Sequence, residues 1–470
     1  LRGSDQSRSR SLQKSVKQLR WEVDDLEKAA ASGGAALHSW AAPIQIEDLQ
    51  SRIPADTALV ELVEYQDLDP SQISADRARG IARLAAFVLR ATGEPRWVPL
   101  GEAAATDASV RAFREALVDT EVSAKKLRER ARDLYDRLAA PLEPHLEGIQ
   151  TVLVAPDGAT VLVPFGALVD PDGHYWVERY EFAYLTSGRD LLLPKSAPPS
   201  GGSPLVVAAP DYDLECLARK GEIGEARARF SPEIAALHFP PIALSQTSAS
   251  DVGRLLGVTP LTGAQASNAA IQTAKAPRVL HIAVDGFFLP DQVRESAVRW
   301  GSIFRIDPHF RPPVTENPLL RSGLALAGAN CRGSAATGGL LTALEIAGLD
   351  LWGTQLVAIA ARWIPSEQAE VGQAVYALRR SWVIAGAESQ FVNLWSTDPR
   401  AATDLTTAYY ERLLAGEGRS EALRGVQLAM LRSENRSHPF YWANFILIGA
   451  RGPITWANSP KAVQAISGSP

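Results

Sequence analysis

The sequence has little of what marks secreted, membrane-spanning or disulfide-rich proteins. Its 470 residues include two cysteines, Cys216 and Cys331, and one pair in so long a chain favours two reduced thiols over a disulfide framework. No apolar run reaches the roughly 20 residues that span a bilayer. The first residues, LRGSDQSRSR, lack the apolar core of a secretion signal. These absences predict a cytoplasmic protein with no membrane partner.

Basic residues are not in excess, and the common cofactor motifs are missing. Lys and Arg number 48 against 53 Asp and Glu, for a net charge of -5, and no basic cluster is interleaved with aromatic residues, which argues against a nucleic-acid partner. There is no G-x-x-x-x-G-K-[ST] loop, no H-E-x-x-H and no CxxC, and the seven His residues are scattered. No metal or nucleotide cofactor is therefore implied. The apolar fraction of 46% is that of a globular protein with a large core.

Composition divides the chain into four parts. Residues 1–38 hold a predicted amphipathic helix from Leu12 to Ala31, followed by a link rich in Gly, Ala and Pro. We interpret this helix either as the end of an upstream helical repeat or as a helix packed on the main body. The chain begins with Leu rather than Met, so we expect it to be a piece of a longer protein. A segment rich in Pro, Gly and Ser separates an N-terminal lobe (39–200) from a C-terminal lobe (201–456), and a tail follows (457–470).

Strand-like and helix-like patterns alternate along both lobes, which predicts an α/β layer structure with a largely parallel sheet. In the N-terminal lobe we expect strands at ALVELVEY and TVLVA, a helix from Asp107 to Leu146, and an aromatic hairpin in HYWVERYEFAYLTS. In the C-terminal lobe we expect buried parallel strands at PLVVAA, RVLHIAV, LALAG, QLVAIAA and SQFVNLW. The Pro-containing segments Cys216–Pro241 and Pro290–Pro318 are predicted to be surface insertions.

Seven longer stretches carry a family resemblance. In order they are VAPDGATVLVPFGALVD, the hairpin ending YLTSG, RVLHIAVDGFF, NPLLRSGLALAGAN, GLLTALEIAGLDLWGTQLVAIAA, LRRSWVIAGAESQFVNLW and HPFYWANFILIG. Together, from about Ser39 to Trp456, they resemble the signature blocks of the CHAT family, bacterial caspase-like domains often attached to tetratricopeptide repeats. The resemblance implies a caspase-like three-layer sandwich with an N-terminal pseudo-caspase-like lobe and a C-terminal caspase-like lobe, similar to caspases, separase and the gingipains.

In that family a His and a Cys at the ends of two neighbouring parallel strands form a catalytic dyad, in strings such as H-I-A-T-H-G and L-S-A-C-E-T-G. The corresponding strings here are H-I-A-V-D-G, ending at Gly286, and I-A-A-R-W-I, ending at Ile364. The resemblance therefore places Asp285 at the position of the His and Arg362 at that of the Cys. A carboxylate is too weak a base to replace imidazole at neutral pH, and a guanidinium has no lone pair to attack a carbonyl. Gly286 keeps the position of an oxyanion-hole donor.

We expect Asp285 and Arg362 to form a salt bridge in a partly buried cleft, where either charge alone would be costly. The alternative is two separate solvated charges. His281 survives, but its four-residue displacement puts it about 13 Å from the strand end, so we interpret it as a buried structural residue. Cys331 and Cys216 lie in loop-like segments with no matching His, and acidic neighbours of Cys216 disfavour its thiolate. A relocated thiol dyad is therefore not expected.

Two further residues are candidates for a substrate pocket. Asp398 follows the strand SQFVNLW, in a region where the resemblance implies an acid that recognises a basic side chain, although Pro399 replaces a second acid. The alternative is that Asp398 caps the helix from Arg400. Trp363 is the other candidate, because it stands beside the expected cleft where family members carry a carboxylate.

The sequence thus predicts a catalytically degenerate peptidase domain. Our leading hypothesis is a non-catalytic module that binds a protein or peptide partner, with regulation of an active peptidase as one use of that binding. One alternative is an active cysteine endopeptidase with an unrecognised nucleophile. The other is a scaffold within a larger signalling or defence protein, joined through its N-terminal helix to upstream helical repeats.

Overall fold

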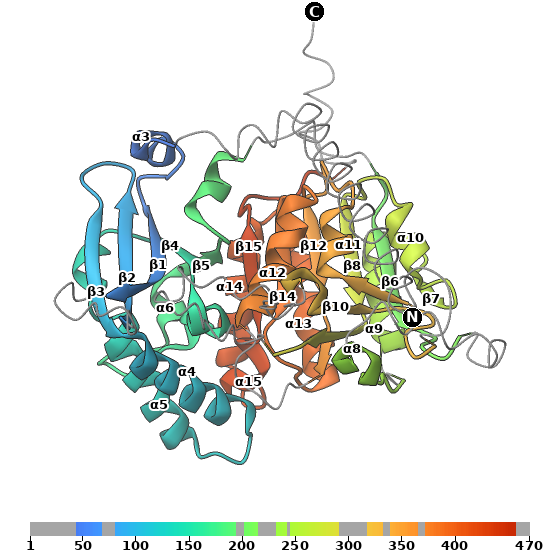
Figure 1. The fold of residues 1–470 in the computed structure, drawn as a ribbon, viewed down its shortest axis with the longest axis horizontal. Coiled ribbons are helices and arrows are strands. Elements are labelled where there is room, and N and C mark those ends of the chain that lie inside the picture. The colour runs from blue at the N-terminus through green and yellow to red at the C-terminus, as the bar shows by residue number, and fades with distance from the viewer. Residues whose placement is uncertain are drawn as a thin grey trace, which may run out of the picture.

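The computed structural model describes residues 44–67, 80–193, 202–214, 232–241, 245–290, 317–331, 339–364 and 372–456. The predicted N-terminal helix, the tail 457–470, Cys216 and most of the segment Pro290–Pro318 lie outside these residues. Within them the chain builds one sheet of 11 strands and a second sheet of four (Figure 1). The predicted lobe boundary near residue 200 stays a prediction, since the described parts on either side of it share the large sheet.

The large sheet has the strand order β3-β2-β1-β4-β5-β15-β14-β12-β8-β6-β7. Neighbours pair antiparallel at β3–β2, β2–β1 and β15–β14 and parallel everywhere else, which confirms the predicted α/β fold with a largely parallel sheet. The strands are β1 Thr57–Asp67, β2 Ile81–Arg90, β3 Arg96–Glu102, β4 Thr151–Ala155, β5 Glu181–Tyr184, β6 Leu205–Pro210, β7 Leu261–Gly263, β8 Val279–Ala283, β12 Leu356–Ile359, β14 Ser389–Asn393 and β15 Phe445–Gly449.

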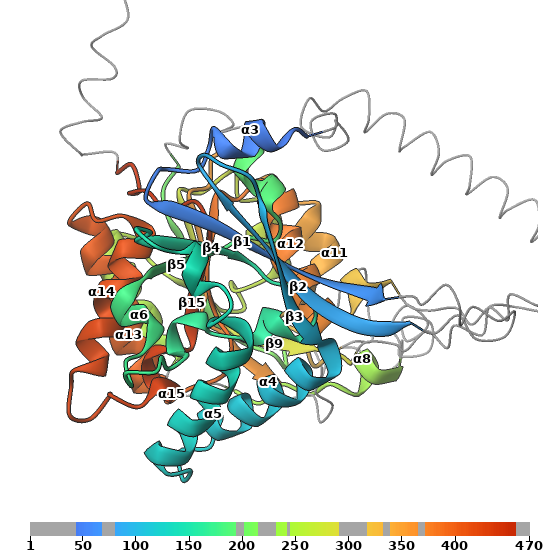
Figure 2. The same ribbon diagram turned by 90° about the vertical axis from the view of Figure 1, so that its left-hand side faces the viewer.

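Helices cover both faces of the large sheet. On one face lie α13 (Pro399–Leu414) and α14 (Arg419–Leu431), and on the other lie α11 (Ala343–Ala347) and α12 (Gly372–Ile384) (Figure 2). Over the central strands water reaches neither face, so β4, β8, β12 and β14 are buried at every residue. The remaining helices are α3 Ile46–Gln50, α4 Ala103–Val118, α5 Ala124–Leu138, α6 Trp176–Arg179, α8 Pro232–Ala236, α9 Ser245–Leu256, α10 Asn268–Gln272 and α15 Pro439–Trp442.

The four-stranded sheet was not predicted. Its order is β11 (Leu340–Thr342), β10 (Ser322–Ala325), β9 (Asp285–Phe288) and β13 (Arg362–Ile364). The run LALAG was expected as a strand of the parallel sheet, but it forms β10 and the residues after it, and β10 pairs antiparallel with β9 and β11. The prediction was wrong because a short apolar run indicates a buried strand without indicating which sheet receives it.

Two local predictions in the N-terminal lobe were also wrong. The expected single helix from Asp107 to Leu146 is two helices, α4 and α5, because the Ser123 hydroxyl accepts a hydrogen bond from Lys126 N (3.3 Å) and caps a new helix start. The expected aromatic hairpin is the one-turn helix α6 followed by the single strand β5. Its large aromatic side chains point into the core instead of pairing across two strands.

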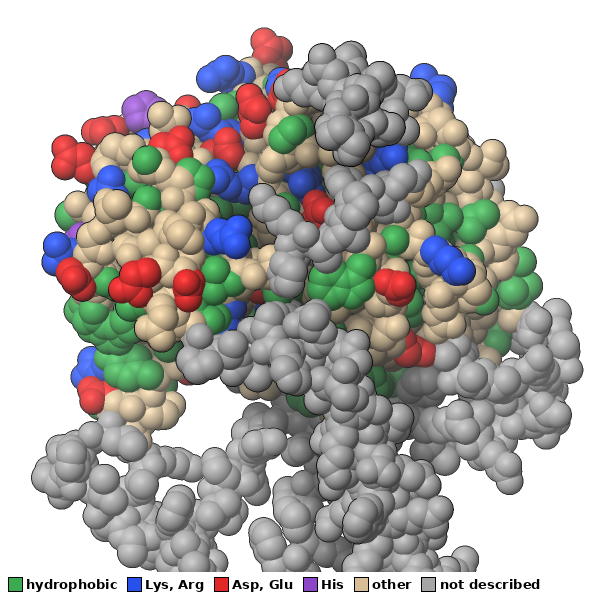
Figure 3. Space-filling view, turned by 90° about the horizontal axis from the view of Figure 1, so that it is seen from above, with side chains coloured by type: hydrophobic (Ala, Val, Ile, Leu, Met, Phe, Trp, Pro, Cys, Tyr) green, Lys and Arg blue, Asp and Glu red, His purple; other side chains and the backbone are tan. Residues whose placement is uncertain are grey.

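The described surface carries both signs of charge. Seen from above, acidic and basic side chains are interspersed over the part of the face that the described residues form (Figure 3). No described helix is long and apolar enough to cross a membrane.

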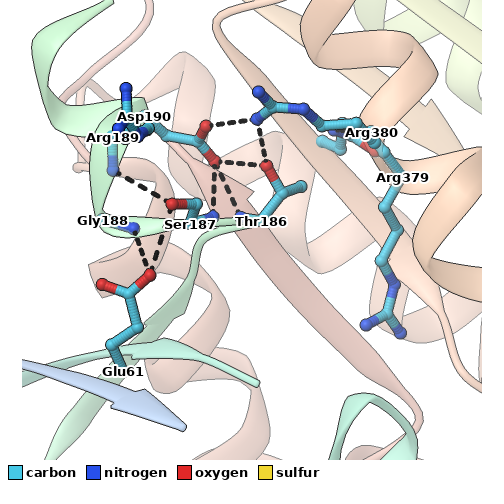
Figure 4. Close-up of polar contacts among 9 residues, drawn as sticks. Glu61, Thr186, Ser187, Gly188, Arg189, Asp190, Arg379 and Arg380 are labelled. Carbon is cyan, nitrogen blue, oxygen red and sulfur yellow. Dashed lines mark hydrogen bonds and ion pairs between the residues drawn. The ribbon is translucent and has the colours of Figure 1, made fainter. Parts of the chain in front are cut away.

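A polar cluster connects the N-terminal strands to α12 (Figure 4). Asp190 Oδ1 pairs with Arg380 of α12 at 2.7 Å, and its Oδ2 accepts from Thr186 N at 2.7 Å. In the same turn Ser187 donates its hydroxyl to Glu61 of β1 at 3.3 Å. Figure 4 shows the neighbouring Arg379 pointing away from Asp190, and its Nη1 donates to the Val161 carbonyl at 2.8 Å instead.

One carboxylate organises the base of the N-terminal lobe. Glu143 Oε1 accepts from Trp176 Nε1 (2.8 Å) and Tyr135 Oη (3.1 Å). Its Oε2 accepts from Tyr180 Oη (3.1 Å) and pairs with Arg179 Nη1 (2.9 Å). Four donors from two segments, α5 and residues 176–180, therefore depend on a single side chain, and three of them belong to aromatic residues of the core.

We predict that Glu143→Ala lowers the free energy of unfolding by about 2–4 kcal/mol, because several largely buried donors lose their acceptor. Urea-induced unfolding measures the change. Glu147→Ala is the matched control, since Glu147 is exposed in the same loop and should change stability by less than about 0.5 kcal/mol. Equal effects of the two substitutions would show that the Glu143 cluster contributes no net stability.

Candidate functional site

Two neighbouring parallel strands bring Asp285 and Arg362 together. β8 and β12 pair in parallel, with Ile282 opposite Ile359. Past their carboxyl ends the chain continues into β9 and β13, which also pair in parallel, and Asp285 lies directly opposite Arg362. The two residues thus lie at the carboxyl edge of the large sheet, where open α/β folds place their sites.

The two side chains form a bidentate ion pair. Arg362 Nε donates to Asp285 Oδ1 at 2.8 Å, and Nη2 donates to Oδ2 at 2.6 Å. The Asp285 side chain is 0% exposed, whereas that of Arg362 is 39% exposed. Arg362 Nη2 also donates to the Pro240 carbonyl at 2.6 Å. The expected salt bridge is therefore present, and the alternative of two separate solvated charges is wrong.

Tyr212 holds the buried carboxylate from the other side. It lies just past β6, the other parallel neighbour of β8, and its hydroxyl accepts from Asp285 N at 2.8 Å. Burial raises the pKa of Asp285, while hydrogen bonds from Arg362 and Tyr212 act to lower it. The hydrogen bond to Asp285 raises the pKa of Arg362, so the guanidinium stays protonated.

Trp363 covers Gly286. A Cβ atom added to Gly286 would lie 2.2 Å from Trp363 Cζ3, so the indole rests directly on the glycine and no other residue fits there. The indole also packs against Phe288, with ring centroids 4.4 Å apart, and Nε1 donates to the Asn393 carbonyl at 2.9 Å. The space beside the Cα of Gly286 is therefore occupied by a side chain of the protein itself.

The other predicted residues lie apart from the ion pair. His281 is buried within β8, its Nδ1 is 3.1 Å from Tyr410 Oη, and burial lowers its pKa to about 4. This is the structural role expected of it. Asp398 accepts from Ala401 N at 2.9 Å and begins α13, so its carboxylate is used as a helix cap, which was the alternative interpretation.

The expectation of two reduced thiols was wrong for Cys331, which is disulfide-bonded. Cys216 lies outside the described residues. The physical reason is tertiary: the turn that ends β10 returns to the loop after β6, where Asn330 N donates to the Tyr212 carbonyl at 2.9 Å. The sequence does not indicate this contact, because residues 212 and 330 are far apart along the chain and meet only when it is folded.

The sequence did not indicate Tyr212 or Pro240 as parts of the site. Residues 232–241 belong to a segment predicted as a surface insertion, yet Ile234 and Phe239 are fully buried and pack with Tyr212 and Phe287 in a separate apolar cluster. That part of the prediction was wrong. The sequence did hold one signal, since Ile234 and Phe239 are large apolar residues among charged ones. The prediction gave more weight to the Pro and charge content of the segment.

We predict that the two halves of the ion pair are unequal. Arg362→Met leaves a fully buried carboxylate without its cation and should lower the free energy of unfolding by about 3–5 kcal/mol at pH 7. Asp285→Asn should cost less, because Arg362 is 39% exposed and can be solvated. The double variant Asp285→Leu/Arg362→Met should recover most of the loss. Urea unfolding at fixed pH gives all three values.

The loss of unfolding free energy caused by Arg362→Met should become smaller as pH falls. Without Arg362 the pKa of the buried Asp285 rises further above that of the unfolded chain. The folded state then binds the proton more tightly than the unfolded state, so stability falls as pH rises through the interval between the two pKa values. A deficit that is larger at pH 5 than at pH 7 would contradict this assignment.

Comparison with known proteins places the chain in a family. The CHAT domain family matches residues 128–450. Among curated proteins, tetratricopeptide repeat protein 28 of Homo sapiens is 27% identical over 353 residues, which cover 71% of this chain and 13% of that protein. The Mus musculus protein of the same name is 26% identical over 354 residues, covering 71% and 14%. The chain thus matches only about one seventh of the length of these relatives.

Among solved structures, the Saccharomyces cerevisiae separase–securin complex is similar with a TM-score of 0.42 and 8% identity, over 86% of this chain and 30% of that chain. The Arg-specific cysteine proteinase gingipain R has a TM-score of 0.34 and 7% identity, over 74% of each chain. Because the family match covers more than half of the 470 residues, the chain belongs to the CHAT domain family.

Proposed function

We propose that this chain is a non-catalytic CHAT domain that acts by binding a protein or peptide. The observation that carries the proposal is the bidentate pair of Asp285 and Arg362 at two adjacent strand ends. Peptide hydrolysis by this fold needs a base and a nucleophile at those places. Both groups present are instead engaged with each other.

The chemistry of the pair supports inactivity. The Asp285 carboxylate is fully buried and accepts two hydrogen bonds from Arg362, so it has no access to a substrate proton. The guanidinium is protonated and also held by the Pro240 carbonyl. Trp363 lies over Gly286 and fills the space beside its Cα, which leaves less room for a substrate at this position.

The same site keeps features suited to binding. β13 is the outermost strand of the four-stranded sheet, although its Trp363 N–H already donates to Ser396 Oγ at 3.0 Å. On this sheet the half-buried rings of Trp363 and Phe288 pack with centroids 4.4 Å apart. A partner would therefore contact these side chains, with the indole of Trp363 as its main apolar contact.

The relatives suggest the wider setting. Their name describes tetratricopeptide repeats, and we propose that this chain is likewise joined to upstream helical repeats. The rival function, an active endopeptidase with another nucleophile, is weakened by the disulfide bond of Cys331. A scaffold role is compatible with the same binding site and differs only in what is bound.

We predict no hydrolysis of a random peptide library by the unmodified chain above the rate in buffer. Asp285→His/Arg362→Cys should remain inactive, because Trp363 still covers Gly286. The triple variant that adds Trp363→Glu should hydrolyse more peptide than the double variant, since this substitution removes the indole from Gly286. Mass spectrometry of the library after incubation detects cleavage. Hydrolysis by the unmodified chain that thiol alkylation abolishes would establish the rival function.

We predict that peptides selected by display against the chain depend on Trp363. Trp363→Ser should lower the affinity of the chain for these peptides by about tenfold or more, the loss typical of a Trp at the centre of an interface. Leu344→Ser is the matched control, because Leu344 is 43% exposed on α11. Isothermal titration gives both affinities, and equal binding by the two variants would exclude this site.

A further inference from the structure

The outer face of the N-terminal strands is only partly covered. Leu59 of β1 and Leu89 of β2 lie opposite each other on this face and are buried beneath Leu49 of α3 and Leu191 of the 3-10 turn Gly188–Leu192. Figure 2 shows α3 across one end of β1, β2 and β3, with the rest of these strands extending away from it. Side chains alternate between the two faces of a sheet. Every second residue after Leu59 on β1 and before Leu89 on β2 therefore lies on this face, but outside the part that α3 covers.

Those residues form an apolar surface, here called the aromatic face. Ile81, Phe87 and Trp97 are 52%, 42% and 47% exposed. The Trp97 ring lies 4.8 Å from that of Phe87 and 5.6 Å from that of Tyr65. By the strand register the same face also carries Val63, Tyr65, Ala85 and Pro99, and towards its far end Ile81 and the ion pair of Arg83 with Asp67. Phe87 and Trp97, two large apolar side chains exposed side by side, indicate a surface that another element covers.

The strand edge beside this face is unsuited to strand addition. β3 is the outermost strand of the large sheet, but Pro99 in its middle has no backbone N–H to donate, and the register of β3 with β2 is irregular between Leu84 and Ala85. A partner therefore packs on the side chains of the face instead of extending the sheet, as an amphipathic helix does.

The chain itself contains a segment of this kind. Apolar residues recur at Leu12, Val16, Leu19, Val23 and Leu26, which places them on one stripe of a helix. Residue 31 is joined to Ile46 of α3 by 14 residues, which reach about 45 Å when extended. Because α3 lies on the same sheet face, this tether starts at the border of the aromatic face and keeps the local concentration of the segment high.

We propose that residues Leu12–Ala31 dock as an amphipathic helix on the aromatic face of β1, β2 and β3. The contact is independent of the proposed peptide binding, since it involves neither the Asp285–Arg362 pair nor Trp363. It makes the N-terminal segment part of the domain, and a helical repeat preceding that segment would then be held at this end of the large sheet.

Hydrogen–deuterium exchange of the whole chain tests the contact. Phe87→Ser/Trp97→Ser should speed exchange within residues 12–31 by about tenfold or more, the change that ~1.4 kcal/mol represents. Leu414→Ser, which alters a side chain 40% exposed at the end of α13, should leave that exchange unchanged. Circular dichroism melting checks that the variants stay folded.

The reciprocal change uses a different readout. Leu19→Asp/Val23→Asp should increase hydroxyl-radical labelling of Trp97 several-fold, because the ring becomes uncovered. Exchange at random-coil rates within residues 12–31 of the unmodified chain, or protection that survives Phe87→Ser/Trp97→Ser, would overturn the proposal. Protection that disappears on dilution would also overturn it, since the aromatic face would then be covered by a second copy.

Discussion

The site depends on one fully buried carboxylate. Asp285 has no exposed surface, so its charge has to be balanced inside the protein. Arg362 balances it from β13, and Tyr212, in the loop after β6, is hydrogen-bonded to the same residue. The Pro240 carbonyl accepts from the same Nη2 of Arg362 that binds Asp285. Three separate segments thus meet at the strand ends because one charge requires them. In a peptidase the same place must stay open to a substrate, and here it is closed by the protein's own groups.

Gly286 illustrates how a residue can be kept for a changed reason. In a catalytic relative a glycine beside the dyad leaves its N–H open to a developing oxyanion. Here a Cβ at Gly286 would collide with the Trp363 ring at 2.2 Å, so packing alone demands glycine. The indole is anchored in turn by Phe288 and the Asn393 carbonyl. Retention of the glycine is therefore no sign of retained chemistry, because the aromatic ring accounts for it fully.

The sequence predicted the large sheet and the ion pair but not the second sheet. Apolar runs such as RVLHIAV and QLVAIAA identified β8 and β12, and the family strings aligned their ends, which placed Asp285 opposite Arg362. The strands β9, β10, β11 and β13 are three or four residues long, too short for a periodic pattern. Tyr212 and Cys331 were missed for a different reason: their roles arise from loops that are distant in sequence and meet only in the folded chain.

A continuous series of contacts joins the aromatic face to the strand-end site. Glu61, at the covered border of that face, accepts from Ser187, and the same turn supplies Asp190 to Arg380 of α12. The residues preceding Arg380 on α12, Leu378 and Arg379, line a small hollow beside Trp363. The helix α12 is therefore fixed at both places, by the ion pair of Arg380 with Asp190 and by the packing of Leu378 and Arg379 beside Trp363.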